Sequence, residues 1–149
     1  VPLMREALAA MAIAPAAEIP PLAPGDHASI RFVLSLAPGW HVHARRPRQE
    51  HLIATIVSLA SDLPAALGPV GYPVPAEREV AGDALLVYEE EVAFDVPVVV
   101  EEDAAAGGYR LEVRVRCQPC GADRCLAPRE VVATATVTIT VDAANDAPA

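Results

Sequence analysis

Residues 111–117 read LEVRVRC, a stretch in which apolar and charged side chains alternate. Side chains alternate across a β-strand, so this pattern predicts a strand with one face in the core and the other in water. The same alternation puts Cys117 on the inward face with Leu111, Val113 and Val115. The sequence therefore predicts that Cys117 is a buried and unreactive core thiol.

The other two cysteines follow this strand closely. Cys120 and Cys125 lie on either side of a turn that contains Gly121, where a solvent-accessible disulfide can form. No helical pattern follows Cys120, which disfavours a thioredoxin-type pair made by Cys117 and Cys120. A bridge across so short a loop restrains the unfolded chain by only about 2 kcal/mol, which favours redox chemistry. A structural disulfide, and a zinc site completed by a histidine, stay open as alternatives.

Alternating or valine-rich patterns predict further strands along the chain. The predicted strands are Ala28–Leu36, Ile53–Ala60, one or two within Leu85–Val100, and Val131–Val141 as the antiparallel neighbour of Leu111–Cys117. Pro97 cannot donate to a sheet, so it predicts an edge or a bulge. We expect turns at 62–71 and a long surface loop at 72–83. Short strands separated by turns indicate an all-β antiparallel sandwich.

The length and charge of the chain limit its class. With 149 residues and 53% hydrophobic content, it is long enough for one domain with a real core. We expect residues 1–23 to be a leader or edge segment with a short helical face or an edge strand, residues 24–142 the domain, and residues 143–149 a tail. The net charge of -9 argues against nucleic acid and anionic membranes as partners. No metal or cofactor is expected.

No apolar run is long enough to span a bilayer, and no secretory signal opens the sequence. We therefore expect an excised piece of a larger protein, with any contact to a membrane made through flanking domains that have been removed. Closely spaced cysteines are compatible with an oxidising compartment.

Four elements in chain order carry a resemblance to a known family. They are Pro38-Gly39-Trp40-His41-Val42-His43, Tyr72-Pro73-Val74-Pro75, Val87-Tyr88-Glu89-Glu90-Glu91-Val92, and Cys117-Gln118-Pro119-Cys120 with Cys125-Leu126-Ala127-Pro128. Together they resemble the N-terminal periplasmic domain of the DsbD family, the thiol:disulfide interchange reductases of bacterial envelopes. The resemblance covers roughly Ala23 to Val141 and implies an immunoglobulin-like β-sandwich.

The resemblance also implies a function. A domain of this kind is part of a protein-disulfide reductase on the extracytoplasmic side of the bacterial inner membrane. It relays electrons from a thioredoxin-like domain or protein to an envelope disulfide isomerase or a cytochrome c maturation oxidoreductase. The alternative is a noncatalytic secreted sandwich that binds a partner and carries a structural disulfide.

The resemblance assigns roles to residues as well. Cys120 and Cys125 match the reactive pair, and Cys117 stands where the family more often has an aromatic residue. His41 and His43 replace phenol-bearing residues beside the pair, and we expect both to face the cysteines with Val42 turned away. A nearby imidazolium or Arg124 favours a thiolate. The four residues Tyr72, Pro73, Val74 and Pro75 fall where the family has a cap loop over the pair.

Overall fold

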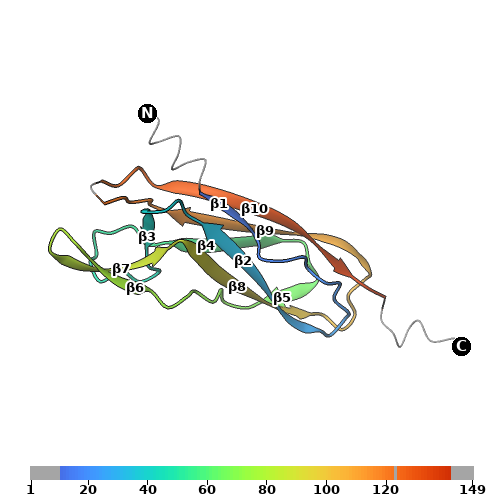
Figure 1. Cartoon of the computed structure of the whole chain (residues 1–149). Coiled ribbons are helices and arrows are strands. Elements are labelled where there is room, and N and C mark those ends of the chain that lie inside the picture. The colour runs from blue at the N-terminus through green and yellow to red at the C-terminus, as the bar shows by residue number, and fades with distance from the viewer. Residues whose placement is uncertain (1–10, 123, 142–149) are drawn as a thin grey trace, which may run out of the picture.

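The computed structural model describes residues 11–122 and 124–141, and all regular elements within them are β-strands (Figure 1). The strands are β1 Ala12–Pro15, β2 His27–Ser35, β3 His41–His43, β4 Ile56–Ser61, β5 Ala65–Leu67, β6 Ala76–Val80, β7 Asp83–Glu89, β8 Glu91–Val100, β9 Gly107–Cys117 and β10 Arg129–Ile139. In these described ranges there is no helix long and apolar enough to cross a membrane.

The strands pair into three antiparallel sheets, ordered β1-β2-β8-β5, β10-β9-β4 and β3-β7-β6. In Figure 1, β9 and β10 run along one side of the elongated molecule, and β2 and β8 run along the other. Buried apolar side chains from both layers form one core. The predicted all-β, immunoglobulin-like sandwich is therefore confirmed.

The core follows the alternation that the sequence predicted. On β8, every second residue from Val92 to Val100 is buried, and Phe94 lies opposite the equally buried Phe32 of β2. On the other layer, β9 and β10 are antiparallel neighbours, with Val115 opposite Val131. The threonines of β10 face outward, as expected for a strand with one buried face.

The start of the described chain is an edge strand. Of the two alternatives for this segment, Ala12–Pro15 takes the strand form and pairs with β2, while Met11 is buried in the core. A backbone bridge between Leu22 and Ile139 then ties the following residues to β10. The alternative was a helical face of Leu3, Ala7, Leu8 and Met11, of which only Met11 lies within the described residues. The predicted tail at 143–149 lies outside them.

Some predicted boundaries were wrong. The strand predicted from Ile53 begins at Ile56. Ile53 and Thr55 instead form hydrogen bonds with His43 of β3. The turn-rich stretch at 62–71 contains the short strand β5. The last strand ends at Ile139 rather than Val141, which is exposed.

The predicted loop at 72–83 is largely a hairpin. Strand β6 pairs with β7 through a two-residue turn at Ala81 and Gly82, whose φ angles of 51° and 87° fit the left-handed turns that join twisted strands. Its three central residues, Glu77 to Glu79, are all exposed. Because neither face of β6 is buried, its sequence has no alternation of apolar and polar residues that would predict a strand.

Pro97 lies neither on an edge strand nor at a bulge, because β8 runs between β2 and β5. The carbonyl of Pro97 accepts a 3.0 Å hydrogen bond from the N–H of Gly68, just beyond the end of β5 at Leu67. The proline therefore lies where the neighbouring strand has already ended. Its missing N–H interrupts no strand pairing.

Candidate functional site

The turn from Cys120 to Cys125, called the cysteine turn below, follows shortly after β9. The N–H of Gly121 donates to the carbonyl of Arg124 at 2.8 Å, and the N–H of Leu126 donates to the carbonyl of Pro119 at 2.8 Å. These bonds set Cys120 opposite Cys125, and a disulfide with an S–S distance of 2.04 Å joins them. The turn thus holds two sulfurs together in a segment outside the main sheets.

The two cysteines differ in exposure. Cys125 is exposed, whereas Cys120 is only 1% exposed. The prediction that the turn exposes both residues was therefore wrong for Cys120. The reason is that Cys120 pairs with His41 of β3 through two backbone hydrogen bonds of 2.8 and 2.9 Å, while Trp40 lies against Gly121. One residue of the pair is therefore exposed to solvent and the other is buried.

Cys117 takes no part in this pair. Its side chain is fully buried, as the strand alternation predicted, and its Sγ lies 3.8 Å from the Sδ of Met11. Burial raises the pKa of the Cys117 thiol to about 11. Because the thiolate is the reactive form, this cysteine is inert at neutral pH. A zinc site that includes Cys117 does not fit this placement in the core.

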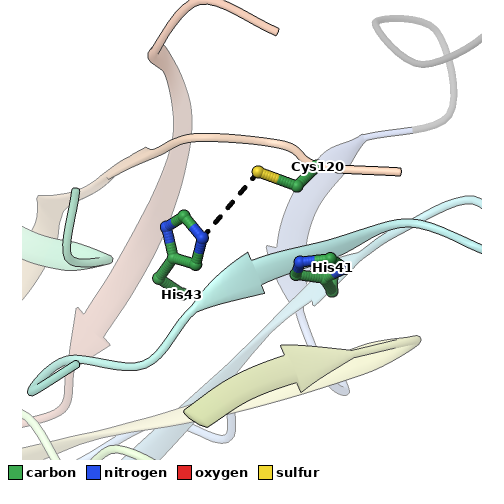
Figure 2. Close-up of side chains that lie close together, drawn as sticks. All are labelled: His41, His43 and Cys120. Carbon is green, nitrogen blue, oxygen red and sulfur yellow. Dashed lines mark hydrogen bonds between the residues drawn. The ribbon is translucent and has the colours of Figure 1, made fainter. Parts of the chain in front are cut away.

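His43 lies beside the buried sulfur, with its Nε2 3.8 Å from the Sγ of Cys120 (Figure 2). Its other ring nitrogen, Nδ1, is 3.2 Å from the carbonyl oxygen of Ile53. A carbonyl only accepts hydrogen bonds, so Nδ1 carries the proton of the neutral ring. The lone pair of Nε2 is therefore directed at Cys120. The hydroxyl of Thr55 donates to the carbonyl of His43 at 2.6 Å and holds the strand in place.

His41 completes a cluster of donor atoms. Its ring lies edge-on to that of His43 with centroids 6.0 Å apart, and it is 8% exposed. Ligand atoms of His41, His43 and Cys120 all lie within 4.8 Å of one another. The structure thus brings together the two predicted histidines and one cysteine, whereas Val42 between them is buried in the hydrophobic core.

Burial dominates the electrostatics of both histidines. Desolvation lowers the pKa of His41, helped by the charge of His43 and opposed by that of Glu89. Desolvation also lowers the pKa of His43, and His51 adds to the effect, while the hydrogen bond to Ile53 opposes it. Burial therefore lowers the pKa of both histidines from the usual value and favours the neutral form of each ring. A neutral imidazole can accept a proton or bind a metal.

Arg124 lies in the turn, directly before Cys125. Its described contact is made by the main chain, whose carbonyl closes the turn, and its side chain is exposed. Sequence reasoning missed Ile53, Thr55 and Trp40 as parts of the site. Ile53 and Thr55 contact His43 from a segment that was predicted as strand. Each of these two hydrogen bonds has a main-chain carbonyl as its acceptor, and a main-chain atom gives no signal in the sequence.

The segment Tyr72–Pro75 has a fixed start and an exposed middle. The hydroxyl of Tyr72 accepts a 2.8 Å hydrogen bond from the N–H of Val57, and its ring stands edge-on to Phe94. The described contacts of Tyr72 are thus with the body of the sandwich rather than with the cysteines. Val74 is 93% exposed and, with Pro73, lines a groove of about 250 Å³. That groove also contains Glu89, the residue paired with His41.

Comparisons with solved structures give remote likenesses. The reduced N-terminal domain of DsbD from Neisseria meningitidis is 14% identical, with a TM-score of 0.48, over 86% of this chain and 88% of that one. The N-terminal periplasmic domain of ScsB from Proteus mirabilis is 19% identical, with a TM-score of 0.45, over 78% and 42%. A complex between the DsbD and PilB N-terminal domains from Neisseria meningitidis matches at 14% identity and a TM-score of 0.44, over 74% and 73%.

No curated protein matches the chain. A family model does match, and it spans residues 9–137, far more than half of the sequence. Its description is "Thiol:disulfide interchange protein DsbD, N-terminal". The chain therefore belongs to the family of N-terminal domains of the thiol:disulfide interchange protein DsbD.

Proposed function

We propose that this domain carries out thiol–disulfide exchange through the Cys120–Cys125 pair. The observation that carries the proposal is the asymmetry of the disulfide. An exposed residue, Cys125, is bonded to a buried one, Cys120, whose Sγ lies 3.8 Å from His43 Nε2. Membership of the DsbD family supports the same chemistry.

The exchange runs in two steps. A thiolate of a thioredoxin-like dithiol attacks the Sγ of Cys125, the Cys125–Cys120 bond breaks, and Cys120 leaves as a thiolate, which receives a proton that His43 takes up at Nε2. The second thiol of the partner then attacks the mixed disulfide and releases Cys125. Two electrons and two protons have passed to the pair, and the partner is left as a disulfide. The reduced pair passes them on by the reverse steps.

Partners and location complete the proposal. The donor is a thioredoxin-like domain or protein, and the acceptor is an envelope disulfide isomerase or a cytochrome c maturation oxidoreductase. The domain works as part of a protein-disulfide reductase on the periplasmic side of the inner membrane. We also propose that Tyr72–Pro75 is a cap that a partner displaces. Two observations support this role: Val74 is exposed, and the groove that it lines includes Glu89, which pairs with His41.

The reduction potential of the Cys120–Cys125 pair tests the proposal. We expect a value between about -180 and -270 mV, the range of exchanging pairs, because an exchanger must be both reduced and reoxidised. Equilibration with glutathione buffers, read by peptide mapping, measures it. A Cys117→Ala variant serves as the control, since removal of the core thiol should leave the potential unchanged. A value below about -300 mV would identify a structural disulfide and reject the exchange function.

His43 gives a second prediction. In the reduced protein, His43→Ala should slow alkylation of Cys120 at neutral pH roughly tenfold and move its pH dependence upward, because the adjacent proton acceptor is lost. Residue-resolved mass spectrometry after timed alkylation measures both effects. His27→Ala, at an exposed histidine on β2, is the matched control. Equal rates in wild type and His43→Ala would remove His43 from the mechanism.

A further inference from the structure

Three potential metal ligands converge on one point of the fold. The ligand atoms of His41, His43 and Cys120 lie within 4.8 Å of one another, and all three residues are buried. They come from two segments, β3 and the cysteine turn. Two imidazoles and a thiolate are the donor types that zinc prefers. In the oxidised protein Cys120 offers no thiolate, since its sulfur is bonded to Cys125.

The surroundings hold these donors in place. The carbonyl of Ile53 accepts a hydrogen bond from His43 Nδ1–H and so leaves Nε2 free, which is the outer-shell arrangement that metal-binding histidines use. The two backbone hydrogen bonds between His41 and Cys120 fix β3 against the cysteine turn. Figure 2 shows the His43 ring and the Cys120 sulfur facing each other. The donor set is therefore positioned by the fold before any ion binds.

We propose that the reduced protein binds one Zn²⁺ ion through His41, His43 and Cys120, with Cys125 as the fourth ligand. The sulfur of Cys125 is set free beside Cys120 when the disulfide opens, on the solvent side of the cluster. Four ligands of this kind complete the tetrahedral coordination of zinc. The inference rests on the proposed function in one respect, because the disulfide must be reducible.

The site exists in only one redox state. A dithiol supplies two electrons and two protons, so that the Cys120–Cys125 bond breaks into two thiols and the dithiol becomes a disulfide. A phosphine does the same with one water molecule and becomes a phosphine oxide. Each thiol that then binds Zn²⁺ releases one proton to solvent. Because zinc occupies both sulfurs, it stabilises the reduced form and blocks attack on a partner. Zinc therefore acts as an inhibitor of the exchange reaction.

Zinc titration of the purified chain tests this inference without any protein partner. The chain is reduced with a phosphine, desalted under anaerobic conditions and titrated with Zn²⁺ against a chromogenic chelator. We expect one ion per reduced chain and none for the oxidised chain. Cys120→Ser and His43→Ala should weaken binding at least as much as loss of an outer-shell partner does, about 10- to 100-fold. His43→Gln provides a second variant with a milder change of shape.

Two control variants separate this site from other donors. His27→Ala removes an exposed histidine and Cys117→Ala removes the core thiol, and both should bind zinc as the wild type does. Equal affinity in the reduced and oxidised chains, or loss of binding in Cys117→Ala, would overturn the proposal. Because no partner is present, zinc binding can hold even where exchange with a thioredoxin-like protein fails.

Discussion

Cys125 in a Cys120→Ser variant should react with a chromogenic aromatic disulfide about 100-fold faster than Cys120 does in a Cys125→Ser variant. Cys125 is exposed, whereas Cys120 is 1% exposed and can react only when the turn opens locally. Both variants carry Cys117→Ala so that each has one thiol. Stopped-flow absorbance follows the two reactions.

The direction of this difference identifies the sulfur that meets partners. A fast Cys125 forms the mixed disulfide, and the buried Cys120 resolves it. Reaction in 6 M guanidinium provides the control, because unfolding should make the two rates nearly equal. Equal rates in the folded variants would contradict the assignment of Cys125 as the partner-facing sulfur.

Phe94→Ala should lower the free energy of unfolding by about 3–5 kcal/mol, the usual cost of removing a buried aromatic ring. The ring of Phe94 is fully buried and stands edge-on to Tyr72 at 5.5 Å and to Tyr88 at 6.5 Å. Urea denaturation measures the loss. The matched control is Val99→Ala on the outer face of the same strand, where we expect less than about 1 kcal/mol.

The same position also bears on the proposed cap. Phe94→Leu keeps an apolar side chain in the core but removes the aromatic contact that supports Tyr72. If the segment that begins at Tyr72 shields the reduced pair, alkylation of the buried Cys120 should be faster in Phe94→Leu than in wild type. An unchanged rate in a variant that is still folded would count against the cap.

The sequence predicted the fold where buried and exposed residues alternate. Strands β2, β8, β9 and β10 each have one buried face, so their apolar residues recur at every second position. Strand β6 has an exposed, charged centre and β5 has only three residues, so neither produced a pattern. Such strands are held by pairing with a neighbour, and a single sequence does not display its pairings.

The site was predictable only in part for a similar reason. The parity of β9 placed Cys117 in the core, and the short spacing allowed Cys120 and Cys125 to pair. The approach of His43 to Cys120 spans 77 residues of sequence, and it was expected from the family resemblance rather than from local pattern. The burial of Cys120 was not foreseen, because it depends on the backbone bridge to His41.

The carbonyl of Ile53 has a consequence for how this site tolerates change over evolution. The orientation of His43 depends on a main-chain oxygen, which every amino acid provides, and not on the identity of a side chain. A substitution of Ile53 leaves this carbonyl in place, so we expect it to keep the same tautomer of the imidazole. The orientation of His43 toward Cys120 therefore does not depend on which side chain stands at position 53.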